Sequence, residues 1–308
     1  MKNSSKLIIW NLAFLLLIFI FFELICGYLI SQFFHYRYDA KTIFQKISVM
    51  LETVAWGYRE YDFSGKISYD FREPIIGTGK KSIILSGCSF TYGLGLESDE
   101  NFSGQLAKYL KKYSVYNIGV NGASPREALY LLRNYEDYKY LFPKDRLNTK
   151  YFIYTYIDDH HRRLLKIIDL NSPFYRKYKK EDGSYGLEQY IPLGFYRKTA
   201  IFRYIDLCRK VKVDKELNNL FTLYMSEMQA EVKNLFPNAE FVVFCYLIND
   251  KFNYDWKELE KRGIRVVKLR DFKHSSFQDE KYAVSDKWHP NGRAWKEIVP
   301  LLAEELNM

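Results

Sequence analysis

The longest apolar stretch of the chain lies close to its amino terminus, at residues 7–30, and only Asn11, Glu23 and small residues interrupt it. A helix rises about 1.5 Å per residue, so roughly 20 residues cross the hydrocarbon core of a bilayer. The apolar region of a cleaved signal peptide is shorter, about 7–15 residues, and ends in small residues. Because this stretch is longer and ends in bulky side chains, we expect a retained signal-anchor: a transmembrane helix at 7–30 after a short tail, residues 1–6.

One acidic residue, Glu23, falls inside this predicted helix. A carboxylate at the centre of a bilayer costs about 2.5–3.5 kcal/mol on insertion scales, and less near an interface. Glu23 therefore lies towards the outer interface or pairs with another helix, and the second arrangement implies a membrane partner. With so few residues ahead of the span, we expect the short end inside and the large domain outside the cytoplasm, in the cell envelope.

After a juxtamembrane segment at 31–76, short apolar runs alternate with amphipathic segments. Five runs rich in Ile, Val, Tyr and Phe have the length of strands: 81–85, 115–118, 151–157, 240–246 and 265–269. Strands that are apolar throughout, separated by amphipathic helices, indicate a parallel sheet covered on both faces. The pattern thus predicts an α/β domain over residues 77–308.

Two helix starts can be read directly. From Asn101 onwards apolar side chains recur at helical spacing, with Ser98 and Asp99 as expected caps. At Ser124 a capping serine is followed by a proline at the first helical position and by Glu127, which completes a capping box.

The alternation fails between residues 162 and 214. Residues 181–184, Glu-Asp-Gly-Ser, have the composition of a hairpin turn, and aromatic residues flank them. The pattern predicts an insertion that is either a substrate lid or a surface excursion. Beyond it, a last helix is expected from about residue 292 to 306, with a kink at its proline.

Composition narrows the classes of partner. Hydrophobic residues make up 48% and charged residues 27% of the chain, as in globular proteins. The net charge of +9 favours acidic surroundings such as anionic lipid headgroups, and there is no dense basic stripe or nucleic-acid motif, so we expect no nucleic-acid partner. Aromatic residues reach 18% and serve either core packing or stacking on sugars. The four cysteines are too few and scattered for a disulfide framework, and Cys245, inside an apolar run, is expected to be a buried thiol.

Ser89 is the first candidate for chemistry. It follows the apolar run 81–85 in a tight turn that contains glycine. A strand-turn-helix context places its hydroxyl at the carboxyl end of the sheet, where open α/β folds bind their ligands.

The second candidate is the pair Asp286 and His289, three residues apart near the end of the chain. On a tight loop this spacing lets the carboxylate accept a hydrogen bond from Nδ1 of the imidazole while Nε2 faces outward, as a general base requires. With Ser89, these residues supply a nucleophile, a base and an orienting carboxylate, the set needed for acyl transfer through a serine ester.

Over residues 80–308 the chain resembles the SGNH/GDSL hydrolases. Gly-Cys-Ser at 87–89 stands where that family has Gly-Asp-Ser, residues 285–291 match its final Asp-x-x-His-Pro block, and residues 117–122 resemble its second block. The resemblance implies a three-layer α/β/α sandwich with a parallel, flavodoxin-like sheet. It also implies an oxyanion hole formed by the N–H groups of Ser89 and Gly122, with Gly119 as the less favoured glycine, just before a capped helix.

The chain departs from the family pattern at two positions. Cys88 replaces the Asp of the first block, which is not a triad member. Asp158 stands where the third block has an oxyanion-binding Asn, and an ionised carboxylate cannot donate a hydrogen bond to an oxyanion. Either His160 or an arginine takes over, or Asp158 stays protonated, or the pocket has another task. His160 and Arg162 are also candidates for substrate binding.

The run Asp158 to His161 could suggest a metal site, but neighbouring side chains on a strand point to opposite faces. We therefore expect no metal and no cofactor. The resemblance, the anchor and the aromatic content together predict a membrane-bound esterase that removes a small acyl group, acetyl above all, from an envelope or surface glycan. Two alternatives stay open: an O-acyltransferase with the same triad, and a catalytically inactive glycan-binding or assembly protein.

Overall fold

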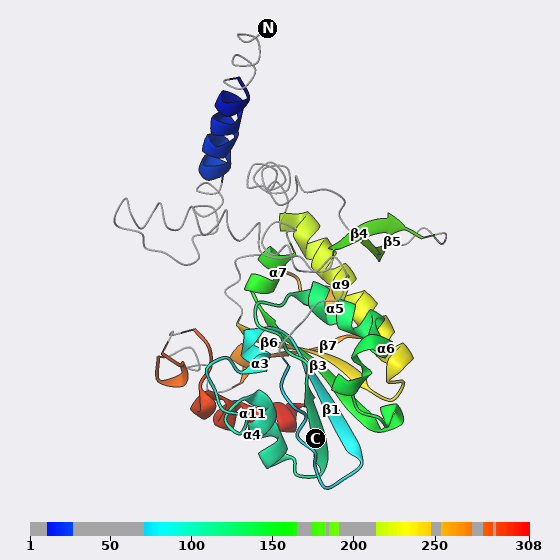
Figure 1. Cartoon of the computed structure of the whole chain (residues 1–308). Coiled ribbons are helices and arrows are strands. Elements are labelled where there is room, and N and C mark those ends of the chain that lie inside the picture. Colours follow the sequence, from blue (N-terminus) through cyan, green and yellow to red (C-terminus); the bar gives the residue numbers. More distant parts are fainter. Residues whose placement is uncertain are drawn as a thin grey trace. The chain divides into compact units, whose positions relative to one another are not determined.

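The structure is a computed structural model of the 308-residue chain (Figure 1). It describes residues 11–26, 71–164, 174–180, 182, 185–190, 214–247, 254–272, 280–285 and 288–308. The chain divides into two compact units, one holding residues 11–26 and the other holding the remaining described residues.

In the first unit, residues 11–26 form a helix, and most apolar side chains between Leu12 and Phe22 are exposed. Within the part of the chain that the structure describes, no helix is both long and apolar enough to cross a membrane. The predicted span 7–30 extends past this helix at both ends, outside the described residues.

The second unit is built on a five-stranded sheet in which all paired neighbours are parallel. Its strands are β1 (Lys81–Ser86), β2 (Tyr113–Asn117), β3 (Thr149–Ile157), β6 (Glu240–Leu247) and β7 (Arg265–Lys268). The order β2-β1-β3-β6-β7 is the flavodoxin-like order of doubly wound folds. All five predicted strands are therefore present, and the predicted parallel sheet is confirmed.

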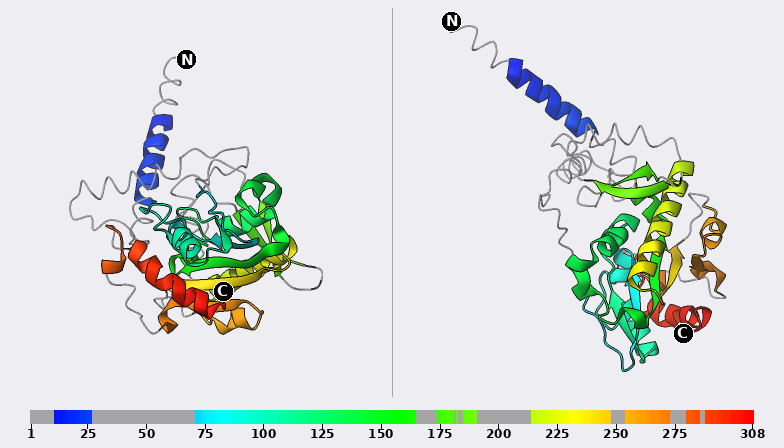
Figure 2. Two further views of the ribbon diagram at one scale, coloured as in Figure 1. Left: turned by 90° about the horizontal axis from the view of Figure 1, so that it is seen from below. Right: turned by 90° about the vertical axis from the view of Figure 1, so that its right-hand side faces the viewer.

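Helices cover both faces of this sheet (Figure 2). Side chains alternate along each strand, and Ile83 and Leu85 join the core formed with α4 (Phe102–Tyr109) and α11 (Gly292–Glu305). The Phe102 ring stacks on Trp295 in this layer, with centroids 4.4 Å apart. On the other face, α5 (Pro125–Arg133) and α9 (Asp214–Leu235) pack together, and Tyr156 of β3 meets Phe221 of α9.

The shorter elements lie at strand ends and in connections. They are α3 (Ser89–Tyr92), α6 (Tyr135–Tyr138), α7 (Asp159–Arg163) and α10 (Lys257–Glu260), with 3₁₀ turns at Lys139–Leu141, Arg146–Asn148, Leu269–Asp271 and Glu280–Tyr282.

The helix starts follow local hydrogen bonding. The capping box of α5 is confirmed, because Ser124 Oγ accepts from Arg126 N and Glu127 Oε2 accepts from Ser124 N at 2.6 Å. The predicted caps of α4 were wrong: Asn101 itself is the N-cap, and its Oδ1 accepts from Gly104 N at 2.9 Å. Asp99 instead pairs with a lysine later in the helix.

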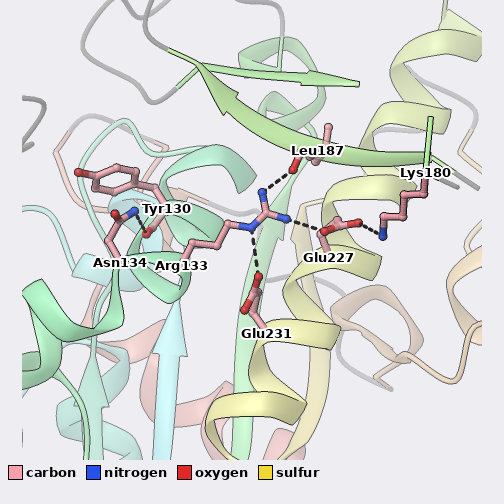
Figure 3. Close-up of polar contacts among 7 residues, drawn as sticks. All are labelled: Tyr130, Arg133, Asn134, Lys180, Leu187, Glu227 and Glu231. Atoms are coloured by element: carbon pink, nitrogen blue, oxygen red, sulfur yellow. Dashed lines mark hydrogen bonds and ion pairs between the residues drawn. The ribbon is translucent and has the colours of Figure 1, made fainter. Parts of the chain in front are cut away.

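The predicted hairpin is present as β4 (Phe174–Lys179) and β5 (Tyr185–Tyr190), which pair antiparallel. Arg133, at the end of α5, fixes it: Nη1 donates to Leu187 O at 2.6 Å, while Nη2 and Nε pair with Glu227 and Glu231 of α9 (Figure 3). Lys180 also pairs with Glu227, at 3.1 Å. The hairpin is thus attached to the helical layer, and most of the predicted insertion at 162–214 lies outside the described residues.

Candidate active site

The turn that carries Ser89 begins where β1 ends. Gly87 has φ +148°, and a Cβ at this position would lie 2.4 Å from Thr91 Oγ1, so only glycine fits there. Cys88 is the N-cap of α3, and Ser89 is its first residue. The sharp turn from strand to helix therefore sets Ser89 at the carboxyl end of β1, an interior strand of the sheet.

Cys88, which replaces the acidic residue of the first block, lies in the apolar core and is fully buried. An aspartate there would have to place a carboxylate among apolar side chains, at a high desolvation cost. Cys245 is also a buried free thiol, as predicted.

His289 reaches Ser89 from the other end of the chain. Its Nε2 lies 2.7 Å from Ser89 Oγ, within hydrogen-bond distance. The ring of Phe90, the residue after the serine, packs against the imidazole with centroids 4.9 Å apart. The structure therefore brings together the predicted nucleophile and the predicted base, although 200 residues separate them.

The loop before α11 holds His289 through its backbone and through Asn291. Val284 N donates to His289 O at 2.9 Å, and Ala283 forms a bridge with Pro290. The Asn291 side chain caps α11 with its Oδ1 and donates from Nδ2 to the Ala283 carbonyl at 3.0 Å. Asp286 lies outside the described residues, so its orienting role stays a prediction.

The second block forms a tight turn beside the nucleophile. Ala123 N donates to Val120 O at 3.1 Å, and Gly122 takes φ +75° inside this turn. Val120 N donates to Gly87 O at 3.0 Å, which joins the turn to the nucleophile loop. Within the described part of the chain, the N–H groups of Ser89 and Gly122 have no acceptor.

Gly119, the less favoured oxyanion glycine, has its N–H occupied, because it donates to Asn117 Oδ1 at 3.0 Å. The same asparagine donates from Nδ2 to Thr91 O at 2.7 Å and is buried. Asn117 thus ties the second block to α3, a role that the sequence did not reveal because Asn in a strand end has no distinctive pattern.

In the third block, Asp158 follows β3 and the next five residues form α7. The prediction that this run continues the strand was therefore wrong. Asp158 is 9% exposed, and Tyr156 Oη donates to its Oδ1 over 3.4 Å. A carboxylate therefore occupies the position at which the family has an amide donor.

Two buried tyrosine–histidine pairs lie behind this position. Tyr154 Oη contacts His160 Nδ1, and Tyr156 Oη contacts His161 Nδ1, each at 2.8 Å. Burial lowers the pKa of His161 to about 3 and lowers the pKa of His160 well below its ordinary value, with the Arg163 cation adding to the second shift. Both rings are therefore neutral at pH 7.

His160 was a candidate for substrate binding and for the oxyanion hole, but it is completely buried and is not placed for either role. The Arg162 side chain lies outside the described residues. Among the residues that the structure describes, no three His, Cys, Asp or Glu side chains converge as metal ligands would. The sequence signal for the tyrosine–histidine pairs is the Tyr-x-Tyr spacing at the end of β3 followed by two histidines.

No family model and no curated protein sequence matches this chain. Solved structures do match, and the three described here have 11–13% sequence identity with this chain. One is a lipolytic protein of the G-D-S-L family from Veillonella parvula, with a TM-score of 0.39 and 11% identity over 73% of this chain and 97% of that one. This is the family that the motifs of the sequence resemble.

Two further matches are esterases. An acetyl xylan esterase from the rumen bacterium Butyrivibrio proteoclasticus has a TM-score of 0.40 and 12% identity, covering 75% of this chain and 65% of its own. A carbohydrate esterase with catalytic and non-catalytic binding functions has a TM-score of 0.45 and 13% identity, covering 76% and 70%. Similarity at this level does not assign a function, which depends on the geometry of the site.

Proposed function

We propose that this chain is a serine esterase of the SGNH type that removes a small acyl group, acetyl above all, from an envelope or surface glycan. The observation that carries this proposal is the 2.7 Å contact between Ser89 Oγ and His289 Nε2 at the carboxyl end of a parallel sheet. A serine hydroxyl that shares its proton with an imidazole is the arrangement of an activated nucleophile.

In the first half of the reaction, His289 Nε2 takes the proton of Ser89 Oγ as this oxygen attacks the ester carbonyl. The negative charge that develops on the carbonyl oxygen is held by the N–H groups of Ser89 and Gly122. His289 then returns its proton to the sugar oxygen, which leaves as an alcohol, and the acyl group remains on Ser89.

In the second half, His289 deprotonates a water molecule that attacks the acyl-serine, and it returns this proton to Ser89 Oγ as the carboxylic acid leaves. In this proposal Asp286 orients His289 and stabilises the imidazolium in both halves. If a sugar hydroxyl takes the place of water, the same residues perform acyl transfer to a second glycan.

The proposed oxyanion hole has two donors and a carboxylate at the third position. In enzymes where one such donor has been removed, the rate falls by about 10²–10³. We therefore expect a slow esterase.

An exposed aromatic ring supports the glycan as substrate. Trp288, the residue before His289, is 71% exposed. An indole beside the catalytic base offers a flat apolar surface to a sugar ring. The exposed apolar side chains of helix 11–26 likewise support our proposal of a membrane anchor and an envelope location.

The test uses the full-length chain in detergent and a fluorophosphonate probe that reacts with activated serines. We expect the wild type and a Ser226→Ala control to be labelled, because Ser226 lies on α9 with its hydroxyl bonded to Thr222 O. We expect no labelling of Ser89→Ala. A folded wild-type protein that resists the probe would contradict the proposal and favour the inactive binding protein, whose saccharide affinity would be unchanged in Ser89→Ala.

The acceptor is decided by a second measurement. The protein is incubated with an acetylated saccharide, once in buffer alone and once in buffer that contains an added glycan. The amount of acetate released is compared with the number of acetyl groups transferred to the added glycan. Release into water regardless of added glycan supports the esterase. Transfer that rises with glycan concentration identifies an O-acyltransferase.

A further inference from the structure

We propose that Arg163 is a positioning residue that holds the oxyanion turn of Gly122 in place, through a pair of crossed arginine–carbonyl bonds. The inference rests on the proposed function, because it assigns a role within that site. Arg163 ends α7, the helix that follows the third block, whereas Gly122 belongs to the second block.

The first bond runs from α7 to the turn. Arg163 Nη1 donates to the carbonyl of Ala123, the residue directly after Gly122, at 2.7 Å. The guanidinium is oriented by Asp159, one helical turn earlier, whose Oδ2 lies 3.1 Å from Nε. A charged donor on a neutral carbonyl makes a stronger hydrogen bond than two neutral groups do.

The second bond runs in the opposite direction. Arg126, in the first turn of α5, donates from Nη2 to the carbonyl of Arg163 at 2.7 Å. Arg126 is only 1% exposed, and its Nε also lies 3.3 Å from Ser124 Oγ. Each arginine thus binds a carbonyl in the other's segment, and the start of α5 is joined to the end of α7.

The Gly122 turn needs such support. Gly122 itself is exposed, and a Cβ at this position would meet no atom within 4 Å, so packing does not fix it. The turn is held from one side by the bond from Val120 N to Gly87 O, and from the other by Arg163 on Ala123 O. Without Arg163, the turn keeps its bond to the nucleophile loop, its internal bond from Ala123 N to Val120 O and the helix cap at Ser124, but Ala123 loses its contact with α7.

The departure at Asp158 makes this support more important. Here the Ser89 and Gly122 N–H groups act alone in the proposed mechanism. Displacements of about 1 Å at a catalytic group cost about 10²-fold in rate.

Arg133 provides a matched control. It lies at the opposite end of α5, about 10 Å from Arg126 along the helix axis. Like Arg163, it donates to a backbone carbonyl and pairs with acidic side chains, but its partners are in the hairpin and α9 (Figure 3). Arg133→Lys therefore disturbs the same kind of contact far from Gly122.

The experiment compares Arg163→Lys and Arg133→Lys with the wild type, as full-length proteins in detergent. A lysine keeps the charge but carries its three N–H donors on one nitrogen, so it cannot reproduce the rigid fork by which the guanidinium binds Ala123 O from Nη1 and Asp159 from Nε. For Arg163→Lys we expect kcat on a small acetyl ester to fall about 10–100-fold with KM within twofold, and backbone hydrogen exchange at residues 120–124 to accelerate. For Arg133→Lys we expect kcat within twofold, even where Tm falls equally.

Equal kcat losses in the two variants, or an unchanged kcat in Arg163→Lys, overturn the inference and leave the proposed function standing. An inactive wild-type protein overturns both. If Arg163→Lys does not fold, Asp159→Asn replaces it, because it removes the ion pair that orients the guanidinium and keeps the backbone contacts. A kcat equal to the wild type in Asp159→Asn then overturns the inference, and a several-fold loss with unchanged KM supports it.

Discussion

The two halves of the candidate site differ in how completely they are built. On the proton-transfer side, Ser89 and His289 lie 2.7 Å apart and their loops are fixed by backbone bonds and by the Asn291 side chain. On the oxyanion side, Asp158 presents a carboxylate where a donor is expected, and the histidines after it are buried against tyrosines. Both halves lie at the carboxyl ends of neighbouring strands of one sheet.

This difference separates two requirements of acyl transfer. Forming the nucleophile needs one short contact between a hydroxyl and an imidazole, and that contact is present. Stabilising the oxyanion needs several donors in fixed positions, and in the proposed mechanism backbone N–H groups are these donors. The chain therefore lets the contributions of the two halves be measured separately.

The largest expected effect is on the proton-transfer side. His289→Ala removes the base that takes the Ser89 proton, and loss of a triad member lowers the rate by roughly 10⁴-fold or more. Cys88→Ala is the control, since Cys88 lies next to Ser89 but in the apolar core, and we expect its activity to stay within a few-fold. Both are measured as kcat/KM on an acetyl ester, and comparable losses in the two variants would contradict our assignment of roles.

The second largest effect is expected on the oxyanion side, from a substitution that restores the missing donor. Asp158→Asn replaces the carboxylate by an amide that can donate, so we expect kcat to rise by about 10²-fold. The amide oxygen can still accept from Tyr156 Oη, so the local fold is preserved. A kcat that stays the same or falls, in a variant with wild-type Tm, would show that Asp158 serves a task other than an imperfect oxyanion hole.

The third effect concerns stability on the oxyanion side. Burial holds the pKa of His161 at about 3, below its value of about 6.5 in the unfolded chain. The unfolded state therefore binds a proton more readily, and the stabilisation is complete above about pH 6.5 and is lost as pH falls towards 3. Between pH 7 and pH 5 we expect the free energy of unfolding to fall by about 2 kcal/mol from this residue.

Urea unfolding at pH 7 and pH 5 measures this loss. The double variant His161→Phe/Tyr156→Phe removes the ring and its hydroxyl partner together, so that neither is left buried without the other, and the Asp158 carboxylate loses its 3.4 Å contact with Tyr156 Oη. It should lose about 2 kcal/mol less than the wild type over the same pH range. An identical pH dependence in both proteins would exclude His161 as the titrating group.

Much of the fold followed from local patterns. The five strands were apolar throughout, and the capping box at Ser124 was a complete sequence signal, so both were confirmed. The caps of α4 were misplaced because Ser98, Asp99 and Asn101 are all good capping residues, and only the chain direction before the helix selects Asn101.

The site was predictable where it depended on spacing and not where it depended on packing. Ser89 and His289 stand in recognisable turns, and the sheet order brings these turns together. Whether His160 faces the pocket or the core depends on the register between α7 and β3, which no local pattern encodes. The role of Arg163 likewise depends on a contact between segments 40 residues apart.

The smallest expected effect concerns substrate binding next to His289. Trp288→Ala removes an exposed ring beside His289 while leaving the contact of His289 with Ser89 in place. Stacking of a sugar on an aromatic side chain is worth about 0.5–1.5 kcal/mol by analogy with aromatic pairs, so KM for an acetylated oligosaccharide should rise about 2–10-fold. Hydrolysis of a small acetyl ester without a sugar should not change. Tyr140→Ala is the control, because Tyr140 is about as exposed but lines a cavity with Ser82 and Ser114, at the opposite ends of β1 and β2. A rise in KM that is equal for both esters would show that Trp288 acts through the structure of its loop. A rise confined to the oligosaccharide would show that Trp288 binds the sugar, so that the site beside Ser89 and His289 recognises the glycan as well as the ester.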